Sequence, residues 1–302
     1  MPDNASERDA LVNRKLPEMQ LSDGSSSSFT ASPPPPPHYL NAGGRAQYRF
    51  AVEGNAIITG GAGTLALEGA RALLEHGLSG LALFDINPQQ AAGPITSLIA
   101  EFPSAQIIAK QVDVRDSENI KTAVAETAKR LGSVDILCCF AGVVGCAHAT
   151  DMTLDEWKRT IDINCTGSFL CAQAVAKHMI AQETGGSMVF IASISGHRVN
   201  FPQPQVAYNV SKSALLSLKN SLAAEWARYG IRVNTISPGY MDTILNEGPG
   251  LENARNIWKS RNPMGRMGVP YELTGPLVML CSGAGSYITA ADIVVDGGGL
   301  VF

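Results

Sequence analysis

IITGGAGTLALEGA, residues 57–70, is the stretch that decides the fold class. The apolar run Ala56–Thr59 leads into a glycine-rich turn, and the turn opens a helical pattern. A glycine-rich turn lets backbone N–H groups approach a pyrophosphate, and the N-terminus of the helix adds its positive dipole end. Ordinary strand–helix turns also contain glycines, so this run by itself indicates a nucleotide site without establishing one.

Short apolar runs continue to alternate with longer helical segments along the rest of the chain. This alternation predicts βαβ units, and hence an α/β fold with a doubly wound, Rossmann-type parallel sheet of about seven strands and helices on both faces. No internal repeat or second domain is evident. The expected strands are Ala56–Thr59, Leu81–Asp85, Ile107–Asp113, Ile136–Phe140, Met188–Ser193, Arg232–Ser237 and Ile293–Asp296.

The composition excludes several classes of protein. With 302 residues, 45% of them hydrophobic, the chain can bury a sizeable core, and its net charge of -4 argues against nucleic acid as a partner. The longest apolar stretch, Ile136–Ala149, is too short to span a membrane, and the N-terminus has no apolar signal segment. The six cysteines show no CxxC pair, so we expect reduced thiols, no metal and a cytoplasmic location.

Residues 1–50 differ from the remainder of the chain. Ser25–Ser28 and Pro33–Pro37 cannot pack a core, so we expect a flexible low-complexity tail before a catalytic domain at 51–302. A proline run can also dock in an aromatic groove of a partner, which remains an alternative.

Asp85 ends the second expected strand, about twenty residues beyond the turn. A carboxylate there can accept hydrogen bonds from an adenosine ribose and would repel a 2′-phosphate. The glycine turn contains no Lys or Arg that could hold such a phosphate. Both observations favour NAD(H), while NADP(H) remains possible.

Tyr208 and Lys212 lie one helical turn apart and share a helix face. A tyrosine with a pKa of ~10 is a poor acid–base catalyst at neutral pH, and a nearby ammonium stabilises its phenolate. Bringing that pKa near neutrality requires roughly 3 units, or about 4 kcal/mol. Ser193, at the end of the fifth expected strand, is placed where α/β sheets bind ligands, and its hydroxyl can bond the reacting oxygen.

The chain resembles the short-chain dehydrogenase/reductase family, single-domain branch, over roughly residues 52–302. The resemblance rests on the order and spacing of several motifs. They are Thr59-Gly60, Cys139-Phe140-Ala141-Gly142, Asn164 within Asn-Cys-Thr-Gly-Ser-Phe-Leu, Ser193-Ile194-Ser195-Gly196, Tyr208-xxx-Lys212, Pro238-Gly239-Tyr240-Met241-Asp242-Thr243 and the closing run Tyr287–Gly298.

The resemblance implies a role for each matching residue. Tyr208 would be the general acid/base, Lys212 would bind the nicotinamide ribose and lower the tyrosine pKa, Ser193 would orient the substrate oxygen, and Asn164 would hold a proton-relay water. Asp113 and Val114 would lie by the adenine, Ala141 and Gly142 by the adenosine ribose, and Met241 and Thr243 by the carboxamide. The remaining expected cofactor contacts are Gly60, Gly61, Gly63, Thr64, Leu65, Asp85, Pro238 and Gly239.

Three features depart from the family pattern. Thr64 and Ala66 replace two glycines of the usual TGxxxGxG turn, and Thr64 would crowd the phosphate unless Gly61 or Gly63 reshapes the turn. Phe140 replaces the asparagine of the usual NAG triplet, which removes an amide that helps to fix neighbouring strands. The spacing to Tyr208 selects Ser195, whereas alignment on the following glycine selects Ser193, which lies nearer the strand end.

The sequence thus predicts an NAD(P)-dependent oxidoreductase that interconverts a secondary alcohol and a ketone. The loop at 195–205 is similar to those of fungal-type polyol and ketose reductases, so a polyol/ketose pair is the expected substrate. A carbonyl reductase of secondary metabolism and a catalytically silent binding protein remain alternatives. The resemblance also implies a homotetramer or homodimer. Residues 244–270 suggest either a mobile lid or a plain surface excursion.

Overall fold

The computed structural model describes residues 11–302, so the first ten residues of the predicted tail lie outside the described part. Seven parallel strands form one sheet in the order β3-β2-β1-β4-β5-β6-β7. The sheet order reverses between β1 and β4, which is where doubly wound sheets open a ligand crevice. The strands are β1 Asn55–Thr59, β2 Gly80–Asp85, β3 Gln106–Gln111, β4 Ile136–Cys139, β5 Gly186–Ile191, β6 Ile231–Pro238 and β7 Asp292–Val295.

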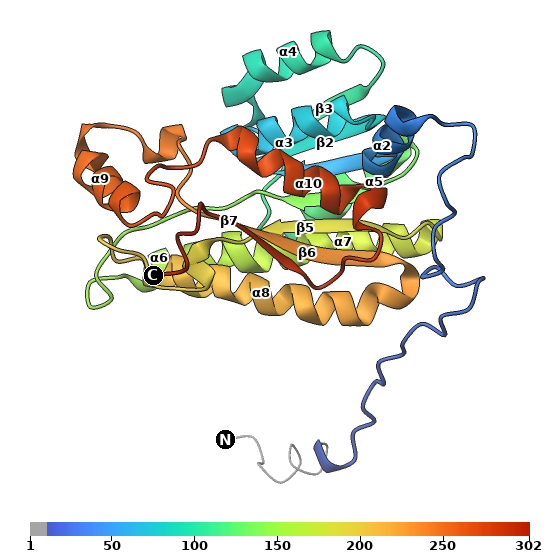
Figure 1. Cartoon of the computed structure of the whole chain (residues 1–302). Coiled ribbons are helices and arrows are strands. Elements are labelled where there is room, and N and C mark those ends of the chain that lie inside the picture. Colours follow the sequence, from blue (N-terminus) through green and yellow to red (C-terminus); the bar gives the residue numbers. More distant parts are fainter. Residues whose placement is uncertain (1–10) are drawn as a thin grey trace.

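Helices cover both faces of the sheet, as the strand–helix alternation predicts. α3, α4 and α10 pack on one face, and α5, α7 and α8 pack on the other (Figure 1). The helices are α2 Ala42–Phe50, α3 Thr64–Glu75, α4 Ala92–Glu101, α5 Ser117–Leu131, α6 Leu154–Ile161, α7 Gly167–Gln182, α8 Val206–Trp226, α9 Glu252–Ser260 and α10 Thr274–Cys281.

The core consists of two apolar clusters separated by the sheet. Within β1, Ala56 and Ile58 belong to the cluster under α3 and α10, while Ile57 belongs to the opposite cluster. This alternation follows from the two-residue period of a strand, and every residue of β1 is buried because helices cover both faces.

Four strands end earlier than the sequence predicts. β4 and β7 each end one residue earlier, at Cys139 and Val295. β3 ends at Gln111 rather than Asp113, and β5 ends at Ile191 rather than Ser193. Beyond the ends of β3 and β5, a polar side chain accepts a hydrogen bond from the nearby backbone. Ser193 accepts a hydrogen bond from Ser195 N, and Asp113 accepts one from Arg115 N. These turns place both side chains just beyond the sheet edge.

The segment before the sheet contains a helix that the prediction of a flexible tail did not include. Asn41 caps α2 through a hydrogen bond from Gly44 N, and α2 lies beside the 3-10 turn Gly283–Gly285. A capping asparagine stabilises a helix N-terminus by satisfying a free backbone donor. The boundary between the tail and the catalytic domain stays a prediction.

Further sequence-based expectations concern membranes, metal ions and the cysteines. None of the helices in the described part combines the length and apolar character needed to cross a bilayer. Within residues 11–302, no three His, Cys, Asp or Glu side chains gather closely enough to hold a metal ion. All six cysteines are free thiols, and Cys138, Cys139, Cys171 and Cys281 are buried.

Candidate active site

The predicted site residues follow the carboxyl ends of adjacent strands. Asp113 follows β3, Asp85 ends β2, the glycine turn follows β1, Ala141 follows β4, Ser193 follows β5 and Gly239 follows β6. Because the strands are parallel and neighbours in that order, these positions line one edge of the sheet. The structure therefore brings the predicted cofactor and catalytic residues together along that edge.

The glycine turn is shaped for close backbone approach. Gly60 has φ of 65°, and a Cβ there would lie 2.7 Å from Ala141 N. At Gly61 a Cβ would lie 2.8 Å from the Leu83 Cβ, and Gly61 N donates to Phe84 O at 3.0 Å. The two glycines therefore let the turn pack closely against β2 and against the segment that follows β4.

Helix α3 begins directly after this turn with its backbone donors uncapped. Its N-cap is Gly63, which has no side chain to accept from the first turn. Thr64 is exposed, and Leu65 is half-buried against the core. The backbone N–H groups of both residues belong to the first turn of α3, at the sheet edge where the predicted site residues lie. Free N–H groups and a helix dipole form an anion site, which fits a pyrophosphate. The threonine that replaces the usual glycine points to solvent at this position.

Gly60→Ala should destabilise the fold and weaken cofactor binding. An alanine at positive φ is strained, and its Cβ would overlap Ala141 N, so we expect a loss of roughly 3 kcal/mol in the free energy of unfolding. Chemical denaturation and a fluorescence titration with NADH measure the two effects. Gly93→Ala, where a Cβ meets nothing within 4 Å, is the control that should lose neither. Equal behaviour of the two variants would contradict this description of the turn.

Asp85 connects the end of β2 to the glycine turn. Its side chain is 8% exposed; Oδ2 accepts from Ala62 N at 3.0 Å and Oδ1 accepts from Asn87 N at 2.9 Å. These two bonds fix a carboxylate beside the glycine turn.

Asp113 and Val114 lie beyond β3 at the same sheet edge. Asp113 pairs with Arg115 at 2.6 Å, and the hydrogen bonds from this guanidinium lower the Asp113 pKa. Val114 is buried against Gly167, where a Cβ would lie 2.8 Å from Val114 Cγ2. Val114 therefore joins the segment after β3 to the start of α7.

The Phe140-Ala141-Gly142 segment continues from β4. Ala141 N donates to Thr59 Oγ1 at 3.3 Å, which ties the segment to β1 without the usual asparagine. Phe140 instead packs its ring over α3, where a Cβ on Gly69 would lie 3.3 Å from Phe140 Cζ. Apolar packing thus replaces the lost amide bonds.

Asn164 lies in a π-helical turn, Asp162–Thr166, between α6 and α7. The side chain is fully buried; Oδ1 accepts from Val143 N at 2.8 Å, and Nδ2 donates to Val143 O and to Ser211 Oγ, each at 2.9 Å. Both amide protons are therefore used in fixing the loop after β4 and the catalytic helix α8. A Cβ on Gly142 would lie 3.4 Å from Asn164 Oδ1 and 3.6 Å from Lys212 Nζ, so the three residues adjoin.

Tyr208 and Lys212 share one face of α8, as their spacing predicts. Lys212 Nζ lies 5.6 Å from the centre of the Tyr208 ring and donates to Ile191 O at 2.7 Å. Burial lowers the pKa of Lys212 to about 8. Burial also raises the pKa of Tyr208, against a lowering effect of its hydrogen bond with Ser193 and a smaller raising effect of Tyr240. The expectation that Lys212 lowers the tyrosine pKa concerns the site with its cofactor and stays a prediction. In the chain alone the Lys212 ammonium donates to a carbonyl, and burial has the largest effect on the Tyr208 pKa.

The two candidate serines are not equivalent in this structure. Ser193 caps the 3-10 turn Ile194–Gly196, and its Oγ donates to Ser195 Oγ at 3.1 Å. Of the two serines, only Ser193 affects the pKa of Tyr208, which it lowers. This influence favours Ser193 as the serine that acts together with Tyr208.

The segment after β6 continues along the same sheet edge. Pro238 ends β6, and Gly239 N donates to Val295 O at 2.9 Å. Met241 and Thr243 are both buried. Met241 forms an isolated bridge with Gly268, which fixes the loop after β6.

Four further residues join this wall and were not singled out from the sequence. Tyr240 stacks on Trp258 with ring centroids 4.1 Å apart and planes 7° apart. Asn200 Nδ2 and Gln203 Nε2 donate to Tyr240 Oη at 2.9 Å and 3.1 Å. These contacts join the loop after β5 to α9, so the segment 244–270 contains a helix packed on that loop, and its role as a mobile lid stays a prediction. The only sequence signal was polar and aromatic residues in loops flanking the catalytic motif.

Comparisons with known proteins agree with this geometry. A family model described as enoyl-(acyl carrier protein) reductase matches residues 60–299. The crystal structure of a short-chain type dehydrogenase/reductase from Mycobacterium marinum is 34% identical, with a TM-score of 0.78 over 84% of this chain and 98% of that one. The chain belongs to the short-chain dehydrogenase/reductase family. It is a nicotinamide-dependent oxidoreductase acting on CH–OH groups, which confirms the sequence-based interpretation.

Two curated relatives are similar over most of their length. The NADP-dependent mannitol dehydrogenase of Hypocrea jecorina is 34% identical over 252 residues, which cover 82% of this chain and 93% of that protein. The ribulose-forming D-arabinitol 2-dehydrogenase of Candida tropicalis is 37% identical over 264 residues, with coverage of 82% and 93%. This short-chain dehydrogenase/reductase therefore resembles enzymes named for polyols.

Proposed function

We propose that this protein interconverts a polyol and a ketose at Ser193, Tyr208, Lys212 and Asn164, with NAD(H) as the preferred cofactor. The observation that carries the proposal is the convergence of these four side chains beside an uncapped helix N-terminus. Ser193 lies close enough to Tyr208 to lower its pKa, Lys212 Nζ lies over the same ring, and Asn164 adjoins Lys212 through Gly142.

The chain's own residues handle the oxygen and its proton. Ser193 orients the substrate oxygen, and Tyr208 gives its phenol proton to that oxygen in reduction or accepts it in oxidation. A nicotinamide held at this site would supply the hydride chemistry at the adjacent carbon. Lys212 is placed to hold the ribose of the cofactor, and Asn164 fixes the loop after β4 and α8 around the lysine.

The substrate class rests on the relatives and on the polar wall of the site. The relatives named above act, by their names, on mannitol and on D-arabinitol. The loop after β5 presents Asn200 and Gln203 to Tyr240, so the wall facing the substrate carries amide and phenol groups. Such groups recognise hydroxyls by directional hydrogen bonds.

The preference for NAD(H) rests on Asp85. Its carboxylate is fixed by Ala62 N and Asn87 N, and residues 60–70 and 85–92 contain no Lys or Arg. A 2′-phosphate at this point would meet a negative charge without a counter-charge from those segments. The Hypocrea jecorina relative is named for NADP, so cofactor choice differs within this group if the proposal is correct.

Asp85→Asn should shift cofactor preference towards NADP(H). The amide retains an acceptor for Ala62 N but removes the charge, so we expect the ratio of kcat/KM for NAD to that for NADP to fall about tenfold or more. Steady-state kinetics with both cofactors measure the ratio. Glu118→Gln, which removes an exposed carboxylate on α5, is the control. An unchanged ratio in Asp85→Asn would remove the case for NAD(H).

A substrate panel tests the proposed reaction itself. Ketopentoses, ketohexoses and their polyols, together with aromatic ketones, are assayed with both nicotinamide cofactors. We expect the highest kcat/KM with a ketose or polyol. Preference for an aromatic ketone would point to a carbonyl reductase, and absence of saturable NADH fluorescence would point to a silent binding protein. The homotetramer or homodimer and the cytoplasmic location stay predictions.

A further inference from the structure

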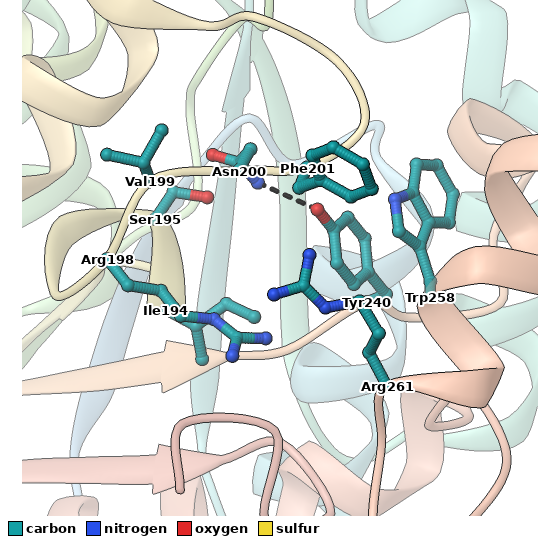
Figure 2. A pocket seen from close by; sticks show the side chains of 9 residues that line it. All are labelled: Ile194, Ser195, Arg198, Val199, Asn200, Phe201, Tyr240, Trp258 and Arg261. Carbon is teal, nitrogen blue, oxygen red and sulfur yellow. Dashed lines mark hydrogen bonds between the residues drawn. The ribbon is translucent and has the colours of Figure 1, made fainter. Parts of the chain in front are cut away.

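A small pocket adjoins the catalytic residues on the side away from the cofactor turn. Its walls come from the turn after β5, the loop that follows it, Tyr240 and the end of α9 (Figure 2). The pocket begins at Ser195, whose Oγ accepts from Ser193 Oγ at 3.1 Å. Its volume is about 20 Å³, and a site of ~10–15 Å³ holds one water. It therefore fits one hydroxyl group of a larger substrate.

The orientation of Gln203 is fixed by Trp258. An indole N–H can only donate, and Trp258 Nε1 donates to Gln203 Oε1 at 3.2 Å. The other end of that amide, which faces Tyr240 Oη at 3.1 Å, is therefore nitrogen. Tyr240 must accept this hydrogen bond.

Tyr240 is left with a proton to donate. Its oxygen accepts from both Gln203 Nε2 and Asn200 Nδ2, so its own O–H is not used in either bond. Figure 2 shows the phenol oxygen directed towards Asn200, with the ring lying beside Trp258. The stack and the two amide bonds fix the position of this donor.

A second observation in the same pocket indicates a ligand. Asn200 Oδ1 is buried and has no hydrogen-bond partner within residues 11–302. A buried carbonyl oxygen without a donor is unfavourable and calls for a partner.

We propose that Tyr240 is a specificity-determining residue whose O–H donates to a second substrate hydroxyl, on a carbon next to the reacting one. The proposal rests on the proposed function of the Ser193–Tyr208 site. It explains why the pocket is only large enough for a hydroxyl. It also explains why Ser195, which lines the pocket, lies two residues from Ser193. Selectivity for hydroxyketones over simple ketones follows, because a simple ketone leaves the Tyr240 O–H without a partner.

The test compares 1-hydroxy-2-butanone with 2-butanone as substrates of the wild type and of Tyr240→Phe. The phenylalanine keeps the ring on Trp258 and removes only the hydroxyl. We expect the kcat/KM ratio of hydroxyketone to ketone to fall about tenfold, mainly through KM, while 2-butanone changes less than about threefold. Tyr271→Phe, an exposed phenol outside the pocket, should leave the ratio unchanged.

The outcomes separate this inference from the proposed function. A wild type that reduces neither ketones nor ketoses overturns both. An active wild type with an unchanged ratio, or with equal losses on both ketones, in Tyr240→Phe overturns the role of Tyr240 alone. If that variant does not fold, Trp258→Phe is measured instead, since it removes the N–H that orients Gln203. A fall of about threefold in its ratio supports the proposal, and no fall overturns it.

Discussion

Tyr208→Phe is expected to lower kcat about 10³-fold in both directions while changing the dissociation constant of NADH less than about threefold. The variant keeps the ring beside Lys212 and loses only the group that exchanges a proton with the substrate oxygen. Cofactor contacts lie on the glycine turn, Asp85 and the loop after β6, none of which depends on the phenol oxygen. Stopped-flow turnover and fluorescence titration measure the two quantities.

The pH profile provides an internal check on the same residue. Burial raises the pKa of Tyr208, so the phenol stays protonated through neutral pH. Oxidation of an alcohol needs the phenolate and should speed up as pH rises, whereas reduction needs the phenol and should not. Tyr287→Phe, a fully exposed tyrosine, should behave as the wild type. Retained turnover in Tyr208→Phe would mean that the proton donor is another group.

Lys212→Met is expected to abolish turnover and to change how stability depends on pH. Burial lowers the Lys212 pKa from 10.5 to about 8, so the folded protein holds its proton less tightly than the unfolded chain. That difference costs the wild type about 3 kcal/mol of unfolding free energy below pH 8, and the cost fades as pH rises towards 10.5. The methionine removes this cost but leaves Ile191 O without its donor, a constant loss of about 1–3 kcal/mol.

The pH-dependent part of the stability change isolates the effect of the Lys212 charge. Between pH 7 and pH 10 we expect the stability of Lys212→Met relative to the wild type to fall by about 2 kcal/mol, as measured by urea denaturation. Lys219→Met is the matched control, because Lys219 is also buried on α8 and donates to Ala290 O. It should leave turnover intact. A relative stability of Lys212→Met that does not vary with pH would show that Lys212 is not desolvated as described.

Much of the fold follows from sequence pattern because burial on both sides of a parallel sheet leaves a strong signal. β1, for example, is a continuous apolar run that ends at a glycine turn, and both features are visible in the sequence. The ends of β3 and β5 were placed too far along, since capping by Asp113 and Ser193 competes with strand pairing and depends on local geometry. The capped helix α2 was missed because its exposed residues carry no core-facing stripe.

The site residues also divide into those that sequence motifs predict and those that only the structure reveals. Tyr208, Lys212 and Asn164 were identified from motifs with fixed spacing. Spacing alone did not identify Ser193, because the spacing to Tyr208 selects Ser195 and only the following glycine selects Ser193. The direction of the Tyr208 pKa shift in the chain alone was not predictable, because it depends on how deeply the phenol and the ammonium are buried. Tyr240 became a candidate only through its contacts with Gln203 and Trp258, which lie far apart in the sequence.

Transfer of deuterium from NADH labelled at C4 to a ketose tests the central proposal most directly. The protein is incubated with the labelled cofactor and a ketopentose or ketohexose, and the product is examined by mass spectrometry and NMR. We expect a polyol with one deuterium on the former carbonyl carbon, formed by the wild type and not by Tyr208→Phe. Cofactor binding without any labelled polyol, or equal labelling by Tyr208→Phe, would contradict the assignment of reaction or of proton donor.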